Sequence, residues 1–182
     1  MPEYLNAQEQ RELLRLARAH FEARVRGEAL PSLTVAGALM RPGGAFVTLT
    51  HGEDLRGCLG RIEPDQPLAR TVAYLAAVVA DEDYRFVPVR VTELEVITIE
   101  ISVLTPPEEI QPAQVEVGRH GLIVEQGHLH GVLLPQVAVE HGWNREMFLS
   151  QTCVKAGLPL DAWRRGVRVR AFEAQVFSEI RR

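Results

Sequence analysis

The stretch Val96–Leu104 alternates strictly between apolar and polar side chains, and this alternation limits the folds open to the chain. One face of the stretch carries Ile97, Ile99, Ile101 and Val103, whereas the other face carries Thr98, Glu100 and Ser102. A period of two residues is that of a β-strand with one buried face. Strands of this kind are typical of antiparallel sheets, in which one face packs against the core and the other face is polar and solvated. Pro106 and Pro107 end the strand.

The order of the other predicted elements indicates an α+β fold. Helices are predicted from the cap Asn6, with Glu9 three residues on, to Gly27 and from Pro67 as first helical residue. Two further helices are predicted over 135–140 and over 144–156, the second with Asn144 as its cap. Strands are predicted over 45–50, 122–124, 131–134 and 167–177, with a bulge near 171–172. Because strands and helices are grouped rather than alternating, we expect a mostly antiparallel sheet with flanking helices.

Length and composition favour an ordinary globular protein. The 182 residues can form one core, or a core with a smaller lobe, and the net charge of −4 gives no reason to expect nucleic acid as a partner. The longest apolar stretch, 71–80, is half of the roughly 20 residues that span a bilayer, so no membrane association is expected. The start of the chain lacks a signal-peptide pattern, and two cysteines without a CxxC pair indicate a reducing compartment. We therefore expect a cytoplasmic protein.

The segment Leu55–Gly60 places Cys58 between two glycines, with Arg56 two residues upstream. Glycine permits left-handed turns and close approach of other groups, so the segment predicts either a tight structural turn or a small pocket. In the pocket, Arg56 would favour the thiolate of Cys58, and the amino end of the helix beginning at Pro67 would add to this effect. In the turn, the cysteine would be a buried apolar filler.

The sequence indicates less clearly which residues would act on such a thiol as a base or hydrogen-bond partner. His51 lies seven residues before Cys58 and could reach it across a hairpin as a base, although its neighbours indicate an exposed turn. Gln136 and Glu140 share one face of a short helix and could supply an acceptor and a carboxylate.

The pair His128 and His130 has a spacing that can hold a metal, with His120 or His141 as further ligands. An exposed hairpin is the simpler interpretation, so no metal site is expected. No dinucleotide fingerprint or phosphate loop is present, and no cofactor is expected.

Several ordered segments resemble the AMMECR-domain family, whose bacterial members are also called AmmeMemoRadiSam system protein A. They are Leu55–Gly60, Tyr84–Phe86, Ile99–Leu104, Gly118–Leu122, Leu133–Ala138 and the run from Phe148 to Trp163. The resemblance covers nearly the whole chain and implies one domain over residues 1–182 with a larger and a smaller lobe that form a cleft. Two departures are Leu59 in place of isoleucine and Tyr84 and Val87 in place of prolines.

The resemblance implies a protein without a settled reaction, which works beside Memo-like and radical S-adenosylmethionine partners. One hypothesis is an accessory module that binds a small molecule or a modified protein group through Arg56, Gly57, Gly60 and Gln136. The alternative is a thiol-dependent enzyme with Cys58 as nucleophile and His120 or Glu140 as acid or base. A third is a scaffold in which the motifs serve the fold.

Overall fold

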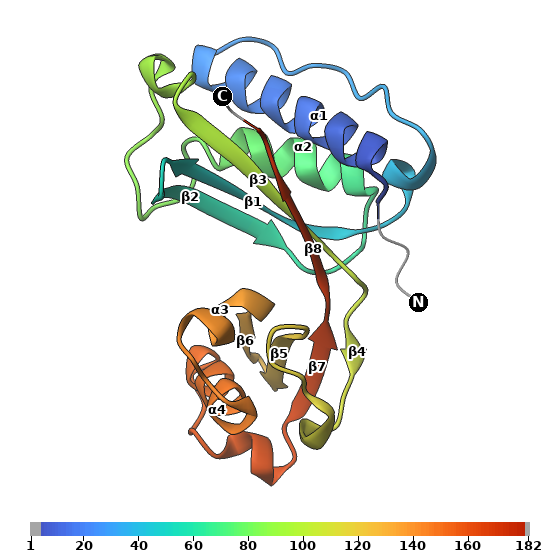
Figure 1. Cartoon of the computed structure of the whole chain (residues 1–182), viewed down its shortest axis with the longest axis vertical. Helices are drawn as coiled ribbons and strands as arrows, with labels where there is room; N and C mark the ends of the chain where they lie inside the picture. The colour runs from blue at the N-terminus through green and yellow to red at the C-terminus, as the bar shows by residue number, and fades with distance from the viewer. Residues whose placement is uncertain (1–4, 181–182) are drawn as a thin grey trace. The chain divides into compact units, whose positions relative to one another are not determined.

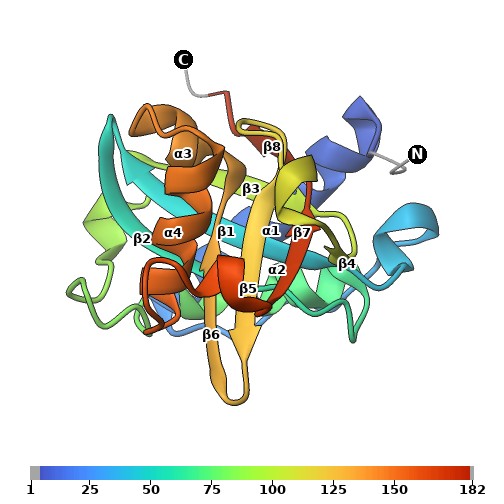
Figure 2. The ribbon, with the colours of Figure 1, turned by 90° about the horizontal axis from the view of Figure 1, so that it is seen from below.

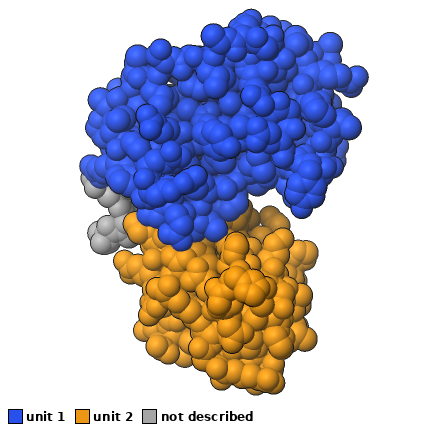
Figure 3. Space-filling model, turned by 180° about the vertical axis from the view of Figure 1, so that it is seen from behind, with its two compact units in different colours: residues 1–103, 175–182 blue, residues 104–174 orange. Residues whose placement is uncertain are grey.

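The structure, a computed structural model, describes residues 5–180 and divides into two compact units (Figures 1 and 3). Unit 1 comprises Met1–Val103 and Gln175–Arg182, and unit 2 comprises Leu104–Ala174. Each unit has its own sheet and its own hydrophobic core. The predicted α+β class is confirmed, although two four-stranded sheets replace the single sheet that we expected.

Unit 1 packs two helices on one face of its sheet (Figure 1). The strands are β1 (Gly44–His51), β2 (Asp54–Arg61), β3 (Ile97–Leu104) and β8 (Ala174–Ser178), in the order β2-β1-β3-β8. The helices are α1 (Ala7–Arg26) and α2 (Leu68–Val78), and two 3₁₀ turns are η1 (Gly37–Met40) and η2 (Val91–Glu93). The isoleucines of β3 lie in the core with both helices, so the side chains of Thr98 and Glu100 belong to the opposite face. We call this opposite face the helix-free face.

Both ends of α1 are set by local signals that the sequence displays. The Asn6 side chain accepts hydrogen bonds from the backbone N–H groups of Gln8 and Glu9, and the Glu9 carboxylate accepts from the N–H of Asn6. Gly27 ends the helix with φ of 70°, a left-handed conformation that glycine adopts without strain. The predicted helix and its caps are confirmed. Pro67, in contrast, precedes α2 as its cap residue rather than being its first helical residue.

The Cys58 segment is part of β2, with a shift of the pairing register at Arg56, so of the two alternatives that the sequence left open the tight turn is wrong. Neither Gly57 nor Gly60 has a positive φ. Both glycines instead allow another group to approach the strand closely. A Cβ on Gly60 would lie 2.1 Å from the nearest atom of the Phe46 ring. A Cβ on Gly57 would lie 3.2 Å from Val79, which begins the segment after α2 (residues 79–93). Gly60 stands opposite Phe46 in the β1–β2 ladder, so the aromatic ring occupies the space that a side chain would need.

Replacing Gly60 by alanine is therefore expected to lower the free energy of unfolding by about 1–3 kcal/mol, because the new methyl group overlaps the Phe46 ring. Urea denaturation of the purified variant measures the loss. The double variant Gly60→Ala with Phe46→Leu, compared with Phe46→Leu alone, should show a smaller effect of the alanine. An equal effect of the alanine in both backgrounds would contradict the proposed overlap.

Unit 2 packs α4 (Arg145–Lys155) against a second sheet (Figure 2). Its strands are β4 (Glu108–Glu109), β5 (Gly121–Gln126), β6 (Leu129–Leu133) and β7 (Arg168–Phe172), in the order β4-β7-β5-β6. The remaining elements are α3 (Pro135–Glu140), η3 (Pro112–Gln114) and η4 (Ala162–Arg165). A Cβ on Gly131 would lie 2.3 Å from the backbone nitrogen of Ala156, so this glycine lets the end of α4 approach β6 closely.

The long strand predicted over residues 167–177 is in fact two strands in different sheets. β7 belongs to unit 2 and β8 to unit 1, with Glu173 between them. The change in apolar parity near Phe172 therefore marks the passage from one sheet to the other and not a bulge. At this passage Glu173 accepts a hydrogen bond from the N–H of Thr105 at 2.9 Å, and its own N–H donates to the Thr105 hydroxyl at 2.8 Å.

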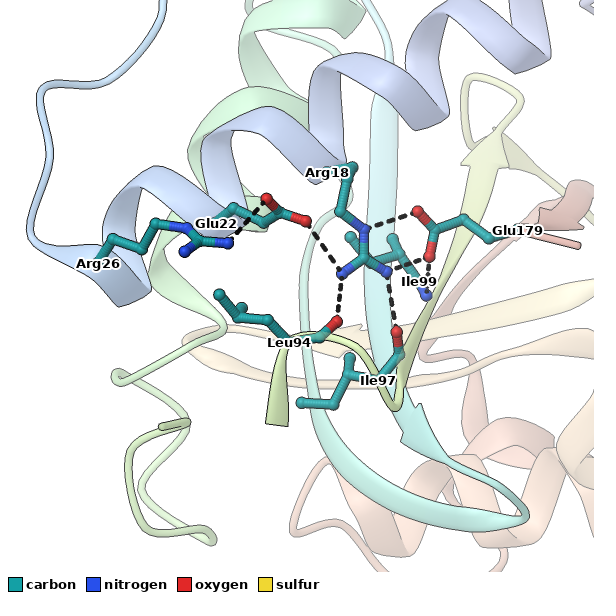
Figure 4. A network of polar contacts seen from close by, with 7 residues as sticks. All are labelled: Arg18, Glu22, Arg26, Leu94, Ile97, Ile99 and Glu179. Atoms are coloured by element: carbon teal, nitrogen blue, oxygen red, sulfur yellow. Dashed lines mark hydrogen bonds and ion pairs between the residues drawn. The ribbon is translucent and has the colours of Figure 1, made fainter. Parts of the chain in front are cut away.

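The end of β8 is held by an arginine of α1 (Figure 4). The Arg18 guanidinium donates to both carboxylate oxygens of Glu179 and to the carbonyl oxygens of Leu94 and Ile97. Glu179 also accepts from the backbone N–H of Ile99 at 2.9 Å. One side chain thus connects α1 with β3 and with the returning chain end.

Among residues 5–180, the helices are too short or too polar for any of them to span a lipid bilayer.

Candidate functional site

Cys58 lies half-buried in the middle of β2, directly opposite Thr48 of β1. The Thr48 hydroxyl donates a hydrogen bond to the Cys58 Sγ at 3.3 Å. Phe46 and Gly60 are the next residues along the same face of the two strands, two positions away. A thiol, a hydroxyl and an aromatic ring therefore share one patch of sheet surface.

β2 is an edge strand, and side chains from the segment after α2 pair with its outer backbone groups. The N–H of Cys58 donates to Asp83 Oδ2 at 2.9 Å, and the Cys58 carbonyl oxygen accepts from Arg85 Nη2 at 3.2 Å. Asp83 and Arg85 also pair with each other through distances of 2.9 Å and 2.6 Å. Both backbone groups of Cys58 are thus held by one ion pair, which replaces a neighbouring strand at this point.

The Asp83 carboxylate is buried, whereas about half of the Arg85 side chain is exposed. The hydrogen bonds from Arg85 and from the Cys58 N–H lower the pKa of Asp83 to about 2, against the opposing effect of burial. Asp83 is therefore charged at neutral pH and fixes the guanidinium in place. The guanidinium also lies over the Phe86 ring, 5.3 Å from its centroid, and the exposed half of the Arg85 side chain lies beside the strand edge.

Burial raises the pKa of the Cys58 thiol above its ordinary value, and the charges of Asp83 and Glu100 add to this rise. The Thr48 hydrogen bond and the charge of Arg85 act in the opposite direction but do not outweigh burial. At neutral pH the thiol is consequently protonated. Glu100 is on β3, whose polar side chains lie on the helix-free face.

Arg56, which we predicted to favour the Cys58 thiolate or to bind a ligand, forms an ion pair with Glu93 in the structure. Its guanidinium donates to Glu93 at 2.8 Å and to the carbonyl oxygens of Val87 and Pro88, and only 15% of the side chain is exposed. This pairing lowers the pKa of Glu93. Arg56 therefore fastens the segment after α2 onto β2, and the guanidinium whose charge favours the Cys58 thiolate is that of Arg85.

The structure divides the predicted site residues into two sets, one in each unit. Unit 1 holds Arg56, Gly57, Cys58 and Gly60 on β2. Unit 2 holds the other three. Within unit 2, His120 accepts a hydrogen bond at Nδ1 from the N–H of Glu116 at 3.0 Å, and Gln136 and Glu140 lie on α3, where Glu140 is exposed.

The other histidines that drew attention in the sequence lie at turns. His51 is exposed and stands opposite Asp54, three residues along β1 from the Thr48–Cys58 pair. His128 and His130 are exposed around the β5–β6 turn, where Gly127 has a φ of 61°. Within residues 5–180, no three or more His, Cys, Asp or Glu side chains gather closely enough to hold a metal ion.

The roles of Asp83, Thr48 and Glu93 were not predicted from the sequence, in which Arg85 stands out only as part of the family resemblance. The available signal was the Asp83-Tyr84-Arg85 spacing, in which two opposite charges are separated by one residue in a segment that follows a buried helix. An acid that is 4% exposed needs a partner, and here the partner is two residues away.

Comparison with known proteins finds one family model and several relatives that match most of the chain. The model of the AMMECR1 family matches residues 14–177. Protein Mbar_A1807 of Methanosarcina barkeri is 43% identical over 94% of this chain and 90% of its own length. Protein PF1979 of Pyrococcus furiosus is 44% identical over 92% of this chain and 86% of its own.

Among solved structures, the crystal structure of the uncharacterized protein PH0010 from Pyrococcus horikoshii superimposes with a TM-score of 0.83. The two sequences are 43% identical, and the match covers 92% of this chain and 90% of the other. The fold described above is therefore similar to that of a protein whose structure has been solved.

Proposed function

The chain belongs to the AMMECR1 family, and from this premise we propose that it is a binding module rather than an enzyme. Its ligand is a small molecule or a modified protein group with an anionic part, held beside Cys58. One observation carries the proposal: the Asp83–Arg85 pair holds both backbone groups of Cys58, so that a half-exposed guanidinium is fixed beside the thiol.

The ligand chemistry follows from the groups around this point. A guanidinium that is already oriented by a carboxylate loses little freedom when it meets a carboxylate or phosphate oxygen. The Phe46 ring and the thiol offer an apolar surface on the helix-free face of β1 and β2. An anion attached to an apolar or aromatic group therefore suits the site better than a bare inorganic ion.

Catalysis by the thiol is less well supported. Burial keeps the thiol protonated at neutral pH, and the hydroxyl of Thr48 is its hydrogen-bond partner rather than a base. An acyl- or alkyl-accepting cysteine needs a thiolate or an adjacent base. Binding therefore agrees better with the geometry.

Benzoate is a suitable probe of the proposed site, because it combines an aromatic ring with a carboxylate. We expect titration of the ¹⁵N-labelled protein with benzoate to shift the amide signals of Thr48 and Cys58, with a weaker response to neutral benzyl alcohol. The variant Arg85→Gln should lose the response, and Arg90→Gln, which changes an 81% exposed arginine of the same segment, should keep it. Equal shifts in the two variants would refute the assignment to Arg85.

Reactivity of the two cysteines tests the alternative, in which Cys58 is a nucleophile. We expect iodoacetamide to modify Cys58 of the native protein with an apparent pKa above that of an ordinary cysteine thiol, because burial raises the pKa of this thiol. Cys153, which is fully buried and whose pKa is also raised by burial, should react more slowly still. Mass spectrometry at a series of pH values separates the two sites. Rapid modification of Cys58 near pH 7 would favour the thiol-dependent enzyme.

The proposed binding role includes association with partner proteins. The family resemblance supports an accessory role in the cytoplasm beside Memo-like and radical S-adenosylmethionine proteins. Co-purification of the tagged chain with each of them, and comparison with the Arg85→Gln variant, tests whether the Cys58 site takes part. Association that survives the substitution unchanged would separate partner binding from this site.

A further inference from the structure

A shallow hollow of about 500 Å³ lies in unit 1, between the outer face of α1 and the chain end that follows β8. Three of its lining residues are cationic, namely Arg11, Arg15 and Arg18, and two are acidic, namely Glu22 and Glu179. The whole protein carries a net charge of −4, so a cationic surface stands out against its background. What the hollow can bind depends on which of these five charges remain free.

The carboxylates of the two acidic residues already form hydrogen bonds or ion pairs within the protein (Figure 4). Glu179 accepts from the Arg18 guanidinium and from the N–H of Ile99, and Glu22 lies 3.9 Å from Arg18 and 3.5 Å from Arg26. Arg18 is itself fixed by two carbonyl oxygens in addition to Glu179. These groups form a rigid and nearly neutral floor.

Arg11 and Arg15 remain exposed, and neither forms an ion pair with another residue in the part of the chain that the structure describes. They are four positions apart on α1, so they lie on the same face of the helix, with Cβ atoms about 5–6 Å apart. Two like charges at this spacing repel each other when no anion lies between them. The surplus positive charge of the hollow therefore resides on these two side chains.

Apolar groups accompany the two arginines. Leu14 lies between them in sequence and is half-buried, and Ile180 on the opposite wall is 94% exposed. Leu14 also packs against the core of unit 1, so the apolar side chain that a small inorganic anion would leave in water is that of Ile180. An extended peptide, by contrast, directs alternate residues to opposite sides and repeats every 6.5–7 Å or so, which approaches the spacing of the arginines.

From these observations we propose that the hollow docks an extended segment of a partner protein in which acidic and apolar residues alternate. The acidic side chains pair with Arg11 and Arg15 on α1, and the intervening apolar side chains, which point to the other side of the peptide, contact Ile180 on the chain end. This surface is separate from the Cys58 site, because its lining residues come from α1 and the chain end and include none of the residues described there.

Fluorescence polarisation with a labelled peptide of about ten residues that alternates Glu and Leu tests the proposal on the full chain. We expect the Arg11→Gln, Arg15→Gln double variant to bind this peptide about tenfold more weakly, and salt of about 0.5 M to abolish binding by screening the exposed pairs. The matched control is Arg70→Gln with Lys155→Gln, which removes the same charge at two exposed positions outside the hollow and should bind normally. Thermal unfolding of both variants shows that they are folded.

Three results would overturn the proposal. They are equal weakening in the control variant, equal binding of a peptide in which Gln replaces Glu, and displacement of the peptide by inorganic phosphate at comparable concentration. The first would mean attraction by overall charge and the second purely apolar contact. The third would mean a simple anion site. Absence of binding to the parent protein at about millimolar peptide would overturn it as well.

Discussion

Replacing Asp83 by alanine is expected to lower the free energy of unfolding by about 3 kcal/mol. The carboxylate is 4% exposed and accepts from Arg85 and from the Cys58 N–H, so its removal leaves a strand-edge donor and a guanidinium without their partner. Urea denaturation at neutral pH measures the loss. Asp81→Ala is the matched control, since Asp81 is two residues away and forms a more exposed pair with Arg24, and it should cost less than about 1 kcal/mol. Similar losses in the two variants would contradict the structural role of Asp83.

The lowered pKa of the same carboxylate leads us to expect that the stability of the protein depends on pH in the acid range. Because its pKa is about 2 in the folded protein and 3.8 ordinarily, its contribution is complete above about pH 5 and is lost as the pH falls through 2. The difference corresponds to about 2 kcal/mol. Between about pH 5 and pH 2 the parent protein should therefore lose about that much more stability than Asp83→Asn. Parallel losses in both proteins would show that other carboxylates govern acid unfolding.

Replacing Arg18 by alanine should cost a similar amount, about 3 kcal/mol. The change leaves Glu179, whose side chain is 16% exposed, and the carbonyl oxygens of Leu94 and Ile97 without their donor. Equilibrium unfolding in urea again measures the effect. Arg15→Ala, one turn earlier on α1 and without an ion pair among the described residues, is the control and should change stability by less than about 0.5 kcal/mol. If the two alanines were equivalent, the network around Arg18 would not hold the chain end.

The sequence predicted best those features whose causes are local. The cap of α1 by Asn6 and Glu9, its end at Gly27, and the cap of α4 by Asn144 each depend on residues within three or four positions, and all are present in the structure. The alternation in β3 likewise needs only one covered face, and α1 and α2 provide it. Such signals can be read without knowledge of the partner elements.

The passage between sheets was not predictable in this way. The segment from Val167 onward has the composition of one long strand, and nothing in it states that β7 and β8 pair with different neighbours. Only the slip in parity near Phe172 hinted at a change. We interpreted that slip as a bulge, because a bulge is the usual cause within a single sheet.

The surroundings of Cys58 show the same limit. Proximity in sequence pointed to Arg56, which the fold turns to Glu93, whereas Asp83 and Arg85 are 25 and 27 residues from Cys58. Which loop covers a strand edge depends on where α2 ends and how it packs, and this is a tertiary property. The glycines were closer to prediction, because their close approach to neighbouring groups was one of the two roles expected for them.

The route of the chain through the two units has a consequence for the order of folding during synthesis. Unit 2 is one continuous stretch, so all of its strands have been synthesised once residue 174 is made. Unit 1, although it begins first, has to wait for β8 and Glu179 before β3 has its second neighbour and Arg18 its ion pair with Glu179. The half of the protein that is translated first is thus the last to be completed. A ribosome-bound chain that ends before residue 174 presents the open edge of β3 to its surroundings.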